Sequence, residues 1–129
     1  MAGTLVANTI NTDTGLFSTN NAYSGIAKAW VQFAGSTGTI AGSFNISSVT
    51  RSGAGVYSLS FTTAMPNTNY IATVTPSADS GTYYMTGMSF STTGGAASSP
   101  TTSGFAFITS RTTAVLSDPV IVSVAVFSS

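Results

Sequence analysis

Apolar and polar residues alternate with a period of two along most of this 129-residue chain. The clearest example is VYSLSFTTAMPNTNYIATVTP, residues 56–76. Tyr57, Leu59 and Phe61 share one face of its first half, and the serines between them share the other. Pro66 then interrupts the pattern with a φ angle that suits a turn, after which the alternation resumes. This pattern predicts two antiparallel, half-buried strands joined by the turn.

The rest of the chain repeats this pattern between turn-forming residues. We expect further extended segments over residues 4–10, 26–33, 39–49, 69–75, 83–91, 105–110 and 119–127. In the segment 39–49, the pattern places Ile40, Phe44 and Ile46 on one face. No window keeps the i, i+3, i+4, i+7 spacing of an amphipathic helix for long. The sequence therefore predicts an all-β protein, an antiparallel β-sandwich or jelly roll of seven to eight strands.

The N-terminal region differs from the body of the chain. Residues 11–25 are polar, and Leu16 and Phe17 stand alone among them. We therefore expect residues 1–25 to form an extended N-terminal arm and residues 26–129 to form the β-sandwich domain. The last predicted strand is apolar on both faces. Such a strand can be central in the sandwich, or can cover the core with one face and a neighbouring subunit with the other.

The composition limits what the surface can bind. The chain has no Glu, His or Cys, and its charged side chains are Lys28, Arg51, Arg111, Asp13, Asp79 and Asp118. A field this weak cannot neutralise a row of phosphates, so we expect no nucleic-acid partner. The 21 serines and 22 threonines supply nearly all of the polar strand positions, which leaves little charge repulsion against association. We interpret the surface as one that contacts other proteins.

Membrane insertion is not expected. No segment reaches the length of about eighteen apolar residues that a membrane helix requires. The start of the sequence lacks the basic and then apolar pattern of a secretory signal. A small outer-membrane barrel shares the alternating pattern of strands, and the missing signal disfavours it.

Candidates for acid–base chemistry are few. Each aspartate stands beside a turn former: Asp13 before Thr-Gly, Asp79 before Ser-Gly and Asp118 before Pro119. Carboxylates in such places bond to nearby backbone N–H groups, so a structural role is favoured over a catalytic pair. Lys28 lies within a strand and lacks the spacing of a serine–lysine pair. The sequence predicts no catalytic residue, no metal and no cofactor, and therefore no enzyme.

Five aromatic residues are candidates for a platform that stacks a sugar ring: Trp30, Tyr57, Tyr70, Tyr83 and Tyr84. Aromatic residues in strands pack more often in cores or interfaces, and that interpretation is favoured. Tyr83 and Tyr84 follow the tight turn at 79–81 and are the best exposed candidates for a receptor contact. Residues 92–104 are small and form a predicted surface loop, a common place for binding function.

Two stretches resemble a module of bacteriophage virion proteins. They are AKAWVQFAG at 27–35 and FNISSVTRSGAGVYSLSFTTAMPNTNY at 44–70. The N-terminal TLVANTINTDTG is similar to the short leader that such proteins carry ahead of the module. The resemblance covers about the first 75 residues. It implies a virion-surface protein or the distal part of a tail fibre, commonly trimeric and with no known catalytic residue.

The resemblance implies a position on the outer surface of a virion. Because the sequence starts at its own Met with no shaft or anchoring domain ahead, we expect a capsid decoration protein, or cement protein, that forms a homotrimer. Its expected partners are further copies of itself and the major capsid protein or another virion protein. The expected contacts with the capsid or a neighbouring subunit come from the arm: Leu5, Val6, Ile10, Leu16 and Phe17.

The alternative is a tail-fibre or head-fibre knob that binds a glycan or another receptor on the host surface. In that case Tyr83 and Tyr84, or the loop 92–104, would make the contact.

Overall fold

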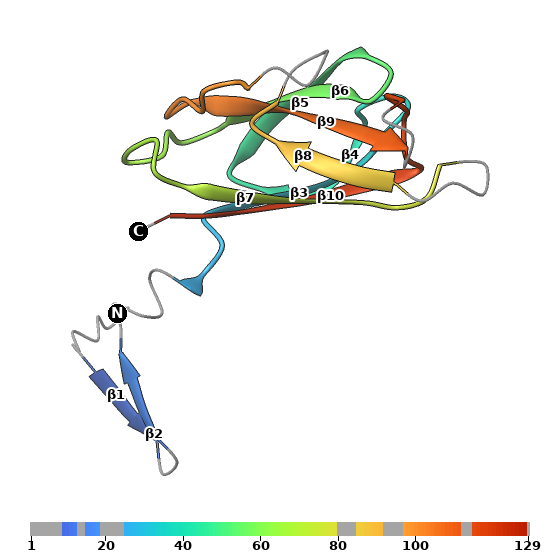
Figure 1. The fold of residues 1–129 in the computed structure, drawn as a ribbon. Helices are drawn as coiled ribbons and strands as arrows, with labels where there is room; N and C mark the ends of the chain where they lie inside the picture. The colour runs from blue at the N-terminus through green and yellow to red at the C-terminus, as the bar shows by residue number, and fades with distance from the viewer. Residues whose placement is uncertain are drawn as a thin grey trace.

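The computed structural model describes residues 9–12, 15–18, 25–79, 85–91, 97–111 and 115–128. The ten elements named for them are strands, as the alternating pattern predicts (Figure 1). The strands are β1 Thr9–Thr12, β2 Gly15–Ser18, β3 Ala29–Ala34, β4 Ile40–Phe44, β5 Ile46–Gly53, β6 Val56–Phe61, β7 Ile71–Pro76, β8 Met85–Ser89, β9 Gly104–Arg111 and β10 Ile121–Phe127. The prediction of an all-β protein is confirmed.

Eight of these strands form two four-stranded antiparallel sheets. The first sheet has the order β4-β3-β10-β7, and the second has the order β5-β6-β9-β8. The C-terminal strand β10 lies in the middle of the first sheet, between β3 and β7. Its alternate side chains Val122, Val124 and Val126 point into the core. The strand is therefore central in its sheet, as one of the two interpretations expects.

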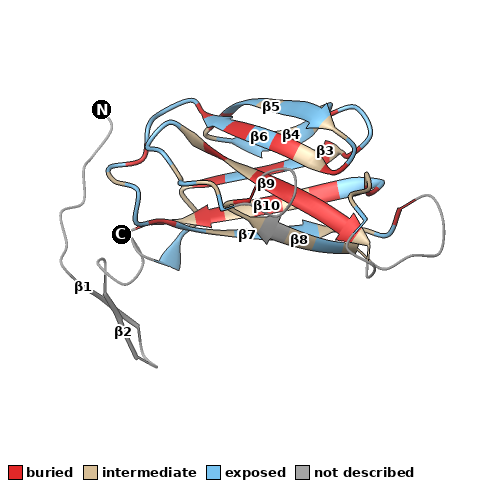
Figure 2. Cartoon of the chain, turned by 45° about the horizontal axis from the view of Figure 1, so that its top comes forward, coloured by how far each residue is buried: buried red, intermediate tan, exposed pale blue. Residues whose placement is uncertain are grey.

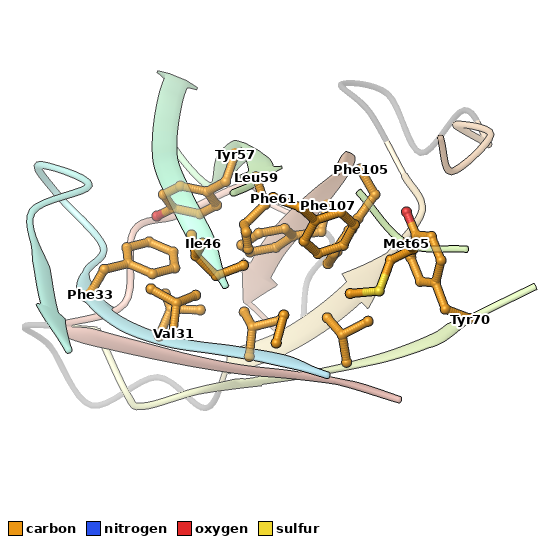
Figure 3. Close-up of a cluster of buried hydrophobic side chains, with 14 residues drawn as sticks. Val31, Phe33, Ile46, Tyr57, Leu59, Phe61, Met65, Tyr70, Phe105 and Phe107 are labelled. Carbon is orange, nitrogen blue, oxygen red and sulfur yellow. The ribbon is translucent and has the colours of Figure 1, made fainter. Parts of the chain in front are cut away.

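The core lies between the two sheets and joins them face to face in a sandwich-like arrangement (Figure 3). Tyr57, Leu59 and Phe61 are all buried, as their alternation predicts. The ring of Tyr57 on β6 lies 5.2 Å, centroid to centroid, from that of Phe33 on the opposite sheet, in an edge-to-face arrangement. The same ring stacks at 5.2 Å on Phe107 of β9, which is itself 6.2 Å from Phe33. Aromatic contacts of this kind add to the stabilisation that burial alone provides.

The predicted strand over 39–49 is wrong, because the structure divides it between the two sheets. The division falls at Asn45, which adopts a φ of 55° between β4 and β5. Its side chain stabilises this corner with three hydrogen bonds. It accepts the Thr63 N–H at 2.7 Å, and it donates to the Lys28 and Thr63 carbonyl oxygens. Asparagine tolerates the left-handed conformation better than other residues with a side chain. The corner turns Phe44 outward, whereas Ile46 points into the core.

The edges of the two sheets meet where β7 passes β8. A Cβ atom at Gly87 would clash with both the side chain and the carbonyl oxygen of Val74, so the approach requires glycine. Edge strands that cover one another present fewer unpaired backbone groups to solvent. On the opposite side of the sandwich, most of β5 is exposed (Figure 2).

The N-terminal strands β1 and β2 pair with each other in an antiparallel hairpin. They form a two-stranded sheet of their own and belong to neither of the larger sheets. The predicted extended segment at 4–10 reaches the described residues only at Thr9 and Ile10. Part of the region predicted to be an arm is therefore a hairpin.

Removing the Phe107 ring from the centre of the core has a predictable effect on stability. We expect Phe107→Ala to lower the free energy of unfolding by about 3 to 5 kcal/mol, because it deletes a buried ring and leaves a cavity. The exposed Thr50→Ala on β5 is the control, with an expected change below about 0.5 kcal/mol. Urea denaturation followed by circular dichroism measures both. Similar losses in the two variants would contradict this account of the core.

Candidate functional site

Charged side chains gather at one end of the sandwich, where they form two ion pairs. Arg51 meets Asp118 through two bonds, Nε to Oδ1 at 3.0 Å and Nη2 to Oδ2 at 2.6 Å. Arg111 donates from Nε to Asp79 Oδ2 at 2.7 Å, and the Asp79 side chain is almost fully buried. All four charges therefore have a partner of opposite sign close at hand.

Asp118 ties its own loop to the β5–β6 hairpin. Besides Arg51, its Oδ1 accepts the Gly55 backbone N–H at 2.8 Å and lies 2.9 Å from the Tyr57 hydroxyl. That hydroxyl lies equally close to the Gly35 carbonyl oxygen, so its single proton serves one of two acceptors at a time. Gly35 in turn packs so closely on Pro119 that a Cβ would clash with the proline carbonyl. The carboxylate thus fastens the loop before β10 to the β5–β6 hairpin, and the close approach of Pro119 to Gly35 packs the same loop on the turn after β3.

These contacts shift the pKa values of the groups involved. Burial alone would raise the pKa of Asp118, but the bonds from Arg51, Gly55 and Tyr57 outweigh it and hold that pKa below its ordinary value. The hydrogen bond to Asp118 raises the pKa of Arg51. Burial, reinforced by the bond to Asp118, raises the pKa of the Tyr57 phenol far above its usual value. Asp118 is therefore a carboxylate, and Tyr57 a neutral phenol, across the physiological pH range.

A hollow of about 510 Å³ lies between the two ion pairs, and Asp79, Arg111 and Asp118 line it. Two carboxylates in one hollow raise the question of an acid–base pair. Such a pair needs one carboxyl group with a raised pKa, whereas Asp118 has a lowered one and Asp79 accepts from a guanidinium. The geometry favours the structural interpretation that the sequence gives for both aspartates.

The opposite end of the first sheet exposes large apolar side chains. Ile26, Phe44 and Ile71 have relative exposures of 60, 55 and 63%, and we call these three residues the apolar rim. Ile26 precedes β3, Phe44 ends β4 and Ile71 begins β7, and the antiparallel register brings these strand ends to the same end of the sheet. A hollow of about 340 Å³ is lined by Ile26, Phe44, Met65, Pro66 and Lys28 among others.

A groove of about 440 Å³ crosses the outer face of the first sheet. Trp30, which is 44% exposed, stands on one side of it, and Thr73 stands on the other. Ala125 lies between them, because the register pairs it with both Trp30 and Thr73. The small side chain of the central strand therefore creates the hollow.

The structure describes three of the five predicted arm contacts, and those only as backbone. Ile10 pairs with Phe17, and Asn11 pairs with Leu16, in the β1–β2 hairpin. The remaining arm contacts, Leu5 and Val6, lie outside the described residues, as do the predicted receptor contacts Tyr83 and Tyr84. The predicted contact residues that the structure does describe, Ile10, Leu16 and Phe17, belong to this separate hairpin and to neither large sheet.

Two of the five aromatic residues considered for a sugar platform are buried instead. Tyr57 belongs to the core, and so does Tyr70, whose hydroxyl donates to the carbonyl oxygens of Thr101 or Gly104. Burial raises the pKa of Tyr70 to about 12. Core packing, the favoured interpretation, is confirmed for this pair. Trp30 is the exposed aromatic ring among the described members of the set.

Sequence reasoning missed both ion pairs and the groove. The partners Arg51 and Asp118 are 67 residues apart, and Asp79 and Arg111 are 32 apart, so no local spacing links them. Among the described residues, no three His, Cys, Asp or Glu side chains are close enough to hold a metal ion. That part of the chain also contains no helix long and apolar enough to cross a membrane.

The chain was compared with known proteins at the levels of family, sequence and structure. No family model, no curated protein and no solved structure matches it.

The lowered pKa of Asp118 predicts a specific dependence of stability on pH. A carboxyl group whose pKa is lower in the folded state stabilises the fold above its unfolded pKa, near 4, and this contribution is lost as the pH falls through the folded pKa. We expect Asp118→Asn to lower the free energy of unfolding by about 1 to 2 kcal/mol at pH 7. The difference from the native sequence should shrink below pH 4.

Urea denaturation of both proteins between pH 2 and pH 7 measures this difference. Tyr70→Phe is the matched control, since it removes a buried hydroxyl that donates to carbonyl oxygens and should cost about 1 kcal/mol at every acidic pH. An Asp118→Asn deficit that stays constant down to pH 2 would show that the carboxylate charge does not stabilise these loops.

Proposed function

We propose that this protein is a non-enzymatic structural protein of a bacteriophage particle, a capsid decoration protein that oligomerises on the shell and stabilises it. The single observation that carries the proposal is the difference between the two ends of the sandwich. The described charges at one end neutralise each other, and the apolar rim at the other end stays exposed. An exposed group of large apolar side chains is typical of a protein-binding surface.

The resemblance to phage virion proteins supports the same surface. The stretch 27–35 contains β3, and the stretch 44–70 begins at Phe44 of the rim. The second stretch also supplies Met65 and Pro66, which line the hollow beside Phe44. The residues that carry the resemblance therefore contribute to the end of the sandwich that we assign to docking.

The N-terminal residues belong to this docking surface in the proposal. Ile26 of the rim directly follows the segment 1–25, so that segment leaves the sandwich beside the rim. Its apolar residues would extend the contact onto capsid subunits or a neighbouring copy. Each Å² of apolar surface that the arm buries contributes about 25 cal/mol, offset by the entropy cost of ordering the chain.

Of the two architectures expected from the sequence, the proposal takes the β-sandwich rather than the jelly roll. Strands β3 and β4, strands β5 and β6, and strands β8 and β9 each pair as neighbours within one sheet. In a jelly roll, successive strands pass between the sheets. The homotrimer remains part of the proposal, as the resemblance implies.

Polar substitutions in the rim test where the protein docks. We expect the triple variant Ile26→Ser, Phe44→Ser, Ile71→Ser to bind shells at least about tenfold more weakly, because it loses most of the apolar area that docking buries. The matched control is Val120→Ser with Ile121→Ser, which changes exposed apolar residues at the opposite end of the sheet.

Co-sedimentation with phage shells that lack the protein measures this binding. Circular dichroism verifies that the variants fold, and analytical ultracentrifugation gives their oligomeric state. Undiminished binding by the rim variant, or equal loss in the control, would refute docking through the rim.

Deleting residues 1–17 tests the arm separately. All buried residues of the core cluster lie between Ala29 and Val126, so the shortened chain should fold with nearly unchanged stability. We expect it to lose binding to shells in the same sedimentation assay. A shortened chain that decorates shells as fully as the native protein would exclude a role for the arm.

The second candidate is a tail-fibre or head-fibre knob that contacts a host glycan through Tyr83 and Tyr84 or the loop 92–104. One observation favours it, the exposed Trp30 beside a groove. An image reconstruction of the virion separates the two candidates, because density for this domain would lie on the shell for a decoration protein and on a fibre for a knob.

A further inference from the structure

The groove on the outer face of the first sheet spans the three neighbouring strands β3, β10 and β7. Trp30 and Gln32 of β3 form one side, and Thr73 and Thr75 of β7 form the other. The floor is β10, where Ser123 and Ala125 face outward between them in register. Its volume of about 440 Å³ falls within the range of small-molecule sites.

The indole of Trp30 has a defined position in this groove. Its six-membered ring lies over Gly42 of β4, where an added Cβ would come within 3.5 Å of it. Because glycine has no side chain here, the ring can lie close to the backbone of β4. The ring also lines the groove, which gives a ligand a flat, apolar and partly exposed surface to stack on.

The polar side chains of the groove make only long hydrogen bonds within the protein. Gln32 Nε2 lies 3.5 Å from Ser123 Oγ, and the Thr73 hydroxyl lies 3.4 Å from the Ala125 carbonyl oxygen. Both distances exceed the 2.7 to 3.2 Å of a good hydrogen bond. These groups can therefore turn toward a ligand at little cost, and together they offer an amide, which both donates and accepts, and two hydroxyls.

The chemistry of the lining limits the class of ligand. None of the described residues that line the groove is charged, so it offers no counter-ion to a phosphate, a carboxylate or an ammonium group. A flat aromatic ring flanked by hydroxyl and amide groups suits a molecule with an apolar C–H face and a rim of hydroxyls. A neutral sugar ring has this combination.

We propose that this groove binds a neutral oligosaccharide, with one sugar ring stacked on Trp30 and its hydroxyls bonded to Gln32, Ser123 and Thr73. The site lies on the sheet face rather than at the rim, so it does not depend on docking to a shell. The alternative occupant of the groove is a second copy of the chain lying across the same face, and the experiments must distinguish it from a saccharide.

The native protein carries its own reporter, because Trp30 is the single tryptophan of the 129 residues. Fluorescence titration with neutral oligosaccharides built from glucose, galactose, mannose or N-acetylglucosamine should give a saturable change in emission for at least one of them. Oligogalacturonate, in which every sugar carries a carboxylate, should bind at least about tenfold more weakly. No saturable response to any neutral sugar would overturn the proposal.

Ala125→Leu fills the floor of the groove without touching the core, and we expect it to weaken binding of the responding sugar at least about tenfold. Its matched control is Ser58→Leu, the same kind of change on the exposed face of β6 in the other sheet. Trp30→Ala and Gln32→Ala, measured by calorimetry, should weaken binding as well. Equal affinity in Ala125→Leu and the native protein would place the sugar elsewhere and overturn the assignment.

Analytical ultracentrifugation of the native protein and Ala125→Leu tests the competing occupant. An oligomer that dissociates on this substitution would show that another copy of the chain covers the groove, and would also overturn the proposal. The sugar assay and the shell assay test the two proposals separately. A protein that binds shells but no sugar contradicts this inference alone, and one that binds sugar but no shells contradicts docking through the rim alone.

Discussion

The inward-facing aromatic rings that join the two sheets are the contact on which the rest of this molecule depends. Tyr57 is central, because its ring packs against both Phe33 and Phe107, while its hydroxyl reaches Asp118. With no cysteine in the chain, no disulfide supports the fold. Burial of apolar surface between the sheets is therefore the main source of stability, and it leaves the outer faces open to variation.

The placement of charge follows from this architecture. Arg51, Asp118, Arg111 and Asp79 neutralise each other within one end, where they hold loops rather than facing a partner. Apart from Lys28, the rest of the described surface carries hydroxyl, amide and apolar groups. Contacts on such a surface depend on shape and buried area more than on long-range steering, so they should respond little to salt.

The sequence predicts what is local and misses what depends on three-dimensional neighbours. A period of two in residues 56–61 is enough to predict that Tyr57 is buried, because alternation alone sorts the two faces of a strand. The corner at Asn45 was missed because it changes φ without disturbing the alternation around it. The ion pairs and the groove depend on which strands are neighbours. Trp30, Ala125 and Thr73 form a row only once β10 is known to lie between β3 and β7.

The pairing of β3 with β10 has a mechanical consequence. The two strands are antiparallel neighbours, and the Lys28 N–H bonds to the Val126 carbonyl at the end where the chain enters the one strand and leaves the other. A force that pulls these two chain ends apart would load the hydrogen bonds between the strands one after another, like a zipper, rather than all together in shear. The first sheet would then open along its middle, so the sandwich would resist tension poorly if it were loaded through both ends.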